Sequence, residues 1–169
     1  MKHGLSVLTA AILVVFTLAC SGFIPDPPPA GPSVIDLGPE ASAAEAGNAL
    51  LKTCRTLLVA GDDRALDCMH PTGHFAFSEK ENGIENATES SGEELRMIWA
   101  SLKMLGLAAD EDWALLLPES LVFDDVGEGT ARAVADLDIE GARMHLELEV
   151  GQDEQGGWRF TDVKWTIEQ

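Results

Sequence analysis

The side chains best suited to proton transfer gather between residues 62 and 74 of the chain. Asp62, Asp63 and Asp67 supply carboxylates, and His70 supplies an imidazole, the group most often used in general acid–base catalysis. An apolar pocket can keep a carboxyl group neutral, so each of the four is a candidate general acid or base. Their spacing matches no established catalytic motif, and we therefore assign no catalytic residue.

A metal site is the second kind of chemistry that this stretch suggests. His70 and His74 have the separation of two ligands on one helix face, and Asp67 would add a carboxylate, a combination that suits zinc. Pro71 and Gly73 lie between the two histidines and interrupt a helix, so the rings need not share a face. We expect two exposed loop histidines, with no metal and no other cofactor.

The four tryptophans are candidates for the wall of a binding pocket. Aromatic side chains line sites for small apolar ligands, but they also fill hydrophobic cores. The sequence leaves both interpretations open for Trp99, Trp113, Trp158 and Trp165.

The N-terminus predicts export. Lys2 and His3 form a short basic start, and residues 4–19 are a charge-free apolar run, shorter than the roughly 20 residues that span a bilayer. The residues before Cys20 resemble the lipobox, where lipoprotein signal peptidase cuts in front of a lipidated cysteine. We therefore expect residues 1–19 to be a signal peptide and Cys20 to carry the lipid anchor. The alternative is an ordinary secretory peptide with an unmodified Cys20.

The residue after Cys20 indicates which membrane holds the lipid anchor. Ser21 is similar to the outer-membrane address in the sorting rule of Gram-negative lipoproteins. The expected location is therefore the outer membrane, with the domain facing the periplasm. In that oxidising compartment Cys54 and Cys68 are expected to pair, and a loop with thirteen intervening residues gives about 3 kcal/mol of stabilisation. Two buried free thiols are the alternative.

Composition limits the partners of the mature chain. The whole chain carries 29 acidic residues against 11 Lys and Arg, and loss of Lys2 with the signal peptide brings the net charge from −18 to −19. Such a surface repels nucleic acid and anionic headgroups, which leaves the lipid at Cys20 as the expected contact with the membrane. Residues 20–40 are rich in proline and predict an extended tether, followed by a single domain at residues 41–169.

Helical periodicity dominates the first half of this domain. Apolar residues predict a helix from residue 40 to Gly61, and Asp62 or Asp63 is placed to cap a short second helix that Pro71 closes. The stripe of the first helix consists of Leu50, Leu51, Cys54, Leu57 and Leu58. Residues 70–92 read mostly as loop, with a short strand at 74–78. A capping box of Ser91 and Glu94 begins a third helix that ends at Gly106, and residues 110–117 add a helical turn.

The last third of the chain predicts strands. After a strand at 121–126, a two-residue turn at Glu140 and Gly141 pairs residues 131–137 with residues 144–150 and makes one face of the hairpin apolar. The charged pairs of the other face are Arg132–Glu149, Asp136–His145 and Asp138–Arg143. The final strand, 158–168, changes phase, which predicts a bulge near Thr161 and Asp162.

This order of elements resembles the nuclear transport factor 2-like superfamily, whose curled sheet and helices enclose a conical cavity. The segments LLKTCRTLLVAGDDRALDCMHP and GGWRFTDVKWTIE carry the resemblance, which covers about residues 45–168. It implies an α+β fold with N-terminal helices packed on a bent, mainly antiparallel C-terminal sheet. A cystatin-like α+β arrangement is the alternative.

The resemblance also bears on function. Enzymes of this superfamily, such as steroid isomerases, place a Tyr hydroxyl against the substrate oxygen, and this chain contains no tyrosine. We expect a noncatalytic domain that binds a small molecule or an envelope protein. One alternative is a small isomerase or hydrolase of apolar substrates that uses Asp62, Asp63, Asp67 or His70. The other is an accessory subunit whose open sheet face forms a homodimer or docks on an envelope complex.

Overall fold

The computed structural model describes residues 31–35, 37, 41–81, 84–104, 117–127, 129–139 and 141–168. The signal-peptide and lipidation predictions, including Cys20, lie outside these residues, as do Trp113 and the expected helical turn around it. Within the described ranges, no helix is long and apolar enough to cross a membrane.

Two helical segments open the domain. Helix α2 spans Ala43–Val59 and begins with a capping box of Ser42 and Glu45, whose side chains bond each other's backbone N–H groups. The chain then turns at Gly61, where a positive φ of 62° suits a residue without a Cβ. The 3₁₀-helix η1, Asp63–Cys68, follows with Asp62 as its N-cap. Both predicted helices are therefore present at the expected places.

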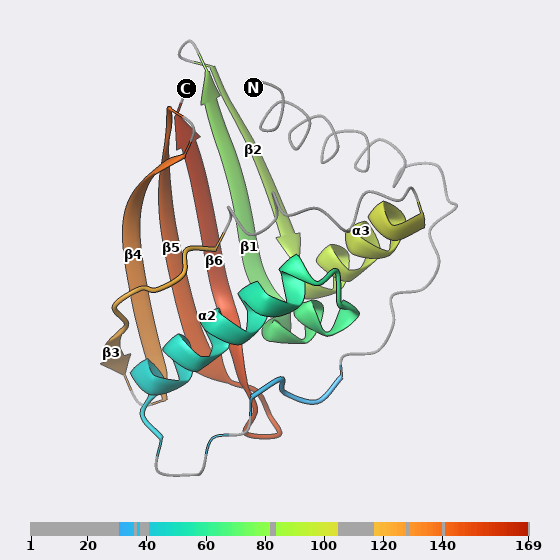
Figure 1. Cartoon of the computed structure of the whole chain (residues 1–169), viewed down its shortest axis with the longest axis vertical. Coiled ribbons are helices and arrows are strands. Elements are labelled where there is room, and N and C mark those ends of the chain that lie inside the picture. Colours follow the sequence, from blue (N-terminus) through green and yellow to red (C-terminus); the bar gives the residue numbers. More distant parts are fainter. Residues whose placement is uncertain are drawn as a thin grey trace.

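Six strands form one mixed sheet beside these helices (Figure 1). The strands are β1 (Met69–Glu81), β2 (Ile84–Ser91), β3 (Asp124–Gly127), β4 (Thr130–Ile139), β5 (Ala142–Gln152) and β6 (Trp158–Glu168). Their order across the sheet is β2-β1-β6-β5-β4-β3, and all neighbours are antiparallel except β1 and β6, which are parallel. The fold is α+β, as expected, but strands from before the third helix contribute to the sheet.

The prediction that residues 70–92 are mostly loop was wrong, because this stretch forms the β1–β2 hairpin, and the short strand expected at 74–78 is part of the longer β1. Strand β2 is the edge of the sheet and is mostly exposed, so it needs no alternation of apolar and polar residues. Pro71 lies inside β1 and does not close η1. The ladder between β1 and β6 skips from Met69 to His74, and Pro71 occupies this irregular interval, where a proline costs no ladder bond.

The third helix and the C-terminal register agree with the sequence. Helix α3 spans Gly92–Met104, and the capping box of Ser91 and Glu94 is formed. Every pair predicted for β4 and β5 is present, from Ala131 opposite Val150 to Asp138 opposite Arg143. The predicted bulge is also confirmed, since the β5–β6 ladder passes from Val150–Phe160 to Glu149–Asp162 and leaves Thr161 without a partner in the ladder.

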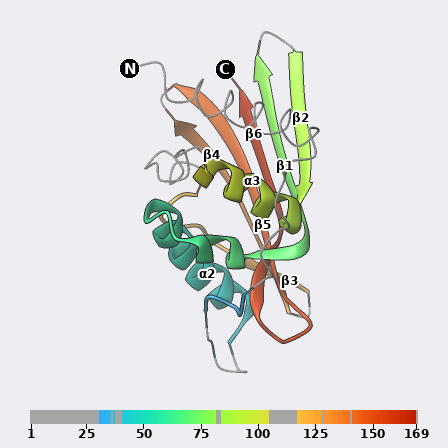
Figure 2. The same ribbon diagram turned by 90° about the vertical axis from the view of Figure 1, so that its right-hand side faces the viewer.

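Helices α2 and α3 lie on the same side of the sheet (Figures 1 and 2). The apolar face of α2 buries Leu50, Leu51 and Cys54 against the sheet face that carries Leu146 and Leu148 of β5. Helix α3 packs against β1, β2 and η1. The η1 segment is therefore held between the two helices, and it carries the acids at positions 63 and 67.

Residues 31–35, which we call the strap, pack on this domain although the sequence assigns them to the tether. The Ser33 hydroxyl donates a hydrogen bond to the carbonyl of Trp158 at 3.2 Å, and Val34 and Ile35 contact the core. Residues 31–35 are therefore packed on the domain and do not act as a free spacer.

Candidate functional site

A buried ion pair joins η1 to α3. Arg96 is only 3% exposed, and its Nη2 donates to Asp67 Oδ1 at 2.9 Å and to the carbonyl of Leu66 at 2.8 Å. The Arg96 Nε–H group is shielded from solvent and has no hydrogen-bond partner among the described residues. Arg96 therefore fixes the distance between η1 and α3 while one of its donors remains unsatisfied.

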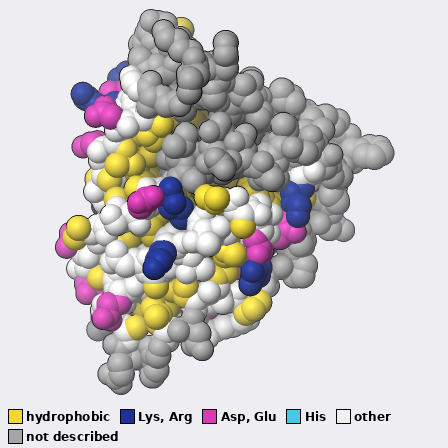
Figure 3. Space-filling view, viewed as in Figure 1, with side chains coloured by type: hydrophobic (Ala, Val, Ile, Leu, Met, Phe, Trp, Pro, Cys, Tyr) yellow, Lys and Arg dark blue, Asp and Glu magenta, His cyan; other side chains and the backbone are white. Residues whose placement is uncertain are grey.

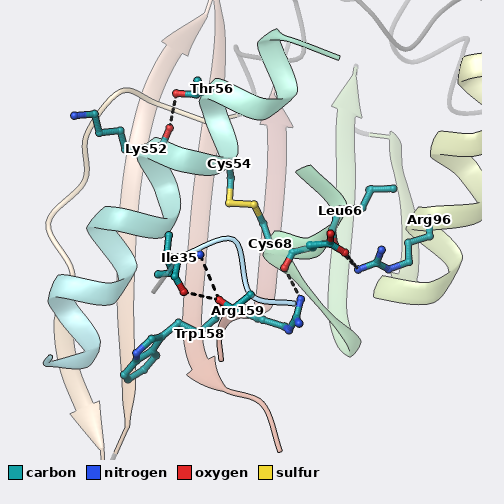
Figure 4. The surroundings of a disulfide bond; sticks show 11 residues. Ile35, Lys52, Cys54, Thr56, Leu66, Cys68, Arg96, Trp158 and Arg159 are labelled. Carbon is teal, nitrogen blue, oxygen red and sulfur yellow. Dashed lines mark hydrogen bonds and ion pairs between the residues drawn. A yellow bond between two sulfur atoms is a disulfide. The ribbon is translucent and has the colours of Figure 1, made fainter. Parts of the chain in front are cut away.

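A second buried arginine joins β6 to the same segment. The Arg159 guanidinium donates to Asp153 Oδ2 at 2.7 Å, to the carbonyl of Gly31 at 2.7 Å, and to the carbonyl of Asp67. Burial acts to raise the pKa of Asp153, but the hydrogen bonds from Arg159 and from the backbone N–H groups of Gly157 and Gln155 hold it below its ordinary value. Figure 4 shows Arg96 and Arg159 approaching the Leu66–Cys68 segment from two sides.

A disulfide ties the same segment to α2. Cys54 on the buried face of α2 is bonded to Cys68, the last residue of η1, with their Cα atoms 6.0 Å apart (Figure 4). The six residues of η1 are therefore held by Arg96 of α3, by Arg159 of β6 and by the disulfide to Cys54 of α2. Asp63 and Asp67 sit on this fixed frame.

A pocket opens between η1 and α3, with a volume of about 370 Å³. We call it the η1–α3 pocket, and it is lined by Gly31, Asp63, Arg64, Leu66, Asp67, Arg96, Trp99, Ala100 and Lys103. Asp63 accepts hydrogen bonds from Trp99 Nε1 at 3.1 Å and from Lys103 Nζ at 2.8 Å. Acidic and basic side chains lie next to each other over η1 and α3 on the visible face (Figure 3).

A second pocket, of about 460 Å³, lies next to the η1–α3 pocket. Its walls include His70, Thr72, Asp153 and Arg159, and Gly31 lines it as well as the η1–α3 pocket. The backbone N–H of Gly31 donates to Asp67 Oδ1 at 2.9 Å, so the strap is attached at the point where the two pockets meet.

The three aspartates predicted as proton carriers all have cationic partners. Asp62 caps η1 and binds Arg64 at 2.6 Å, and this hydrogen bond lowers the pKa of Asp62 to about 2. Asp67 is bonded to Arg96, and Asp63 is bonded to Lys103. His70 lies away from them, in the second pocket, where its Nδ1 accepts from the Thr72 N–H at 3.3 Å.

The histidines do not converge. His74 lies on β1 between Glu89 and Asp162, at 3.7 and 3.5 Å, and within the described ranges no cluster of three His, Cys, Asp or Glu side chains could hold a metal ion. His145 is the cross-strand partner of Asp136, as its register predicts, with Nδ1 at 2.8 Å from the carboxylate.

The tryptophans are also dispersed. Trp99 is buried and lines the η1–α3 pocket, whereas Trp158 is buried at the start of β6 beside the strap. Trp165 is half-buried in the core, and neither it nor Trp158 lines either pocket. Of the described tryptophans, Trp99 alone lines one of these two pockets.

Sequence reasoning missed the buried arginines and Lys103. Arg96 follows Leu95 of the apolar stripe of α3, and Arg159 falls between two apolar residues of β6, so both positions read as solvent-facing. Sequence alone does not single them out, because Arg132 and Arg143 are also flanked by apolar residues and are exposed.

No family model and no curated protein matches the chain. Among solved structures, it is similar to an NTF-2-like protein of unknown function from Silicibacter pomeroyi, at 19% identity over 70% of this chain and 90% of that chain, with a TM-score of 0.40. It is also similar to putative ketosteroid isomerases from Parabacteroides distasonis and Shewanella frigidimarina, each at 16% identity and a TM-score of 0.41. These cover 70% and 73% of this chain, and 82% and 94% of their own. Likenesses of this degree carry no activity over to the present protein.

Proposed function

We propose that the protein is an exported, lipid-anchored domain that binds a small ligand in the η1–α3 pocket without transforming it. The observation that carries this proposal is the η1–α3 pocket, whose wall is fixed by the hydrogen bonds of the buried Arg96 to Asp67 and to the carbonyl of Leu66.

The composition of the pocket supports ligand binding. Leu66, Trp99 and Ala100 supply apolar surface, and Lys103 and Arg96 supply a few donors at fixed positions. Small-molecule sites combine an apolar lining with a small number of oriented polar groups, in volumes of about 300–1,000 Å³. The frame around η1 favours a site that is formed before the ligand arrives.

The state of the acids supports binding without catalysis. A general base needs a pKa near the working pH, and Asp62, with a pKa of about 2, cannot take a proton there. Asp63 and Asp67 accept hydrogen bonds from Lys103 and Arg96, so their oxygens are already engaged within the protein. The chain also lacks the tyrosine on which the related enzymes depend.

Ligand occupancy can be tested by native mass spectrometry of the full-length protein in mild detergent. We expect extra mass that is lost on denaturation. Ala100→Trp should abolish it by filling the pocket, and Glu93→Trp, at an exposed position on the first turn of α3, should retain it. Equal native and denatured masses for the wild type would contradict the proposal. So would turnover of a substrate that is lost in Ala100→Trp.

The anchor and the fold family belong to the same proposal. The element order and the strand order β2-β1-β6-β5-β4-β3 support a nuclear transport factor 2-like domain, and the lipobox-like sequence before Cys20 supports a lipid anchor at the outer membrane, facing the periplasm. Cys20→Ala should accumulate as an unacylated precursor. Acylation of this variant at the wild-type level, measured by labelled palmitate, would refute the anchor.

A further inference from the structure

Two donors of α3 converge on one carboxylate at the mouth of the η1–α3 pocket. Trp99 and Lys103 are four residues apart and share a face of the helix. Lys103 Nζ lies 2.8 Å from both oxygens of Asp63, and Trp99 Nε1 lies 3.1 Å from Oδ1. The Asp63 carboxylate therefore marks a position where this wall of the pocket binds an anion.

Asp63 holds this position only weakly. Its side chain is 65% exposed and that of Lys103 is 44% exposed, and ion pairs at such sites contribute little to stability. Trp99 is buried, so its indole N–H stays in place whichever carboxylate accepts it. A second carboxylate that also buried an apolar body in the pocket would displace Asp63 at small cost.

The remaining charges of the pocket favour an anion as well. The lining contains three cations, Arg64, Arg96 and Lys103, against the carboxylates of Asp63 and Asp67, in a chain whose net charge is −18. Asp67 is committed to Arg96 and to the N–H of Gly31, and Asp62 lies outside the lining, bonded to Arg64. Displacement of Asp63 would leave Lys103 as the uncompensated charge.

We propose that the ligand is a small organic carboxylate with an apolar body, whose acid group replaces Asp63 on Lys103 and Trp99. This inference rests on the proposed ligand-binding function and adds the class of ligand. The body lies against Leu66, Trp99 and Ala100, and Asp63 acts as a built-in competitor for the anion position. Asp63 therefore weakens binding, whereas in a site for a cation it would strengthen it.

The test uses fluorine NMR of the full-length protein in mild detergent with three probes of one shape. 4-Fluorobenzoate is the anion, 4-fluorobenzamide its neutral isostere, and 4-fluorobenzylamine the cation. We expect the benzoate to bind more tightly than the other two. Asp63→Asn should tighten benzoate binding by about two- to fivefold, the factor that matches loss of a competing surface ion pair, and leave benzamide binding unchanged.

Two further variants distinguish loss of the anion contact from loss of the whole pocket. Lys103→Met should weaken benzoate binding by about tenfold or more, since it removes a charge-assisted hydrogen bond, and should spare benzamide. Ala100→Trp should abolish binding of every probe. Benzoate binding that is weaker or unchanged in Asp63→Asn, a preference for benzylamine, or no benzoate binding at all would each overturn the inference. Benzamide binding that Ala100→Trp abolishes would still support the pocket itself.

Discussion

Replacing Arg96 with Met should lower the free energy of unfolding by about 3–5 kcal/mol. Arg96 is 3% exposed, and the change removes its hydrogen bonds to Asp67 and to the carbonyl of Leu66. The buried carboxylate of Asp67 is then left with the N–H of Gly31 as its one described donor. Most of the cost comes from this uncompensated charge, because methionine replaces the apolar part of the arginine.

The double variant Arg96→Met, Asp67→Leu separates this cost from the loss of contacts. With both charges gone, no buried ion remains, and the net cost should fall to about 1–2 kcal/mol, mainly for the unsatisfied N–H of Gly31. Urea unfolding of the full-length, oxidised protein, monitored by tryptophan fluorescence, measures each value. An unchanged m value, the slope of the unfolding free energy against urea concentration, supports the comparison.

A matched control uses an exposed pair. Arg132 is 47% exposed and is bonded to Glu147 across the β4–β5 ladder, so Arg132→Met should cost no more than about 1 kcal/mol. The reasoning is refuted if Arg96→Met costs no more than this control. It is also refuted if the double variant costs as much as the sum of the single variants, since the two charges would then not act as a unit.

Three further predictions concern the disulfide, one histidine and the strap. Reduction of the Cys54–Cys68 bond should lower the free energy of unfolding by about 3 kcal/mol, and a variant with alanine at both positions should not respond to reductant. The hydrogen bond with Asp136 raises the pKa of His145 above its ordinary value of 6.5. The stability that protonated His145 adds through this contact is therefore present below pH 6.5 and is lost as pH rises through the raised pKa. His145→Gln should therefore cost more stability at about pH 5.5 than at about pH 8.5, by less than about 1 kcal/mol, and an equal cost at both would contradict the assignment. A Cβ on Gly31 would lie 2.4 Å from Asp67 Oδ2, so Gly31→Ala should speed amide hydrogen exchange in residues 31–35 but not in β5, and unchanged exchange would argue against docking of the strap.

The hairpin of β4 and β5 was predictable because a single register makes one of its faces apolar and pairs opposite charges on the other. A one-residue slip would move Leu146 and Leu148 out of the core and bring Glu147 into it. Local spacing also predicted α2 from its apolar stripe, and it predicted η1 and α3 from the caps Asp62 and Ser91, which are close in sequence to the groups they bind.

The parts that were not predictable depend on partners distant in sequence. The local pattern indicated only a short strand at 74–78, whereas β1 spans Met69–Glu81 and pairs in parallel with β6, some ninety residues later, a neighbour that no local pattern encodes. The charged residues of the η1–α3 pocket also come from positions far apart in the sequence. Arg96 lies 29 residues from Asp67, and Lys103 lies 40 residues from Asp63, so only the fold brings these charges together.

Docking of the strap has a consequence for where the pocket works. Asp67 Oδ1 accepts from both Gly31 N–H and Arg96, so the tether is fastened to the ion pair that forms the inner wall of the η1–α3 pocket. With Cys20 in the membrane, as proposed, eleven residue steps separate the lipid from Gly31. At about 3.1–3.6 Å per step, they keep this point within about 40 Å of the membrane surface. Free movement of all residues from 20 to 40 would almost double that reach, so the docked strap would keep the η1–α3 pocket closer to the membrane than a free tether would.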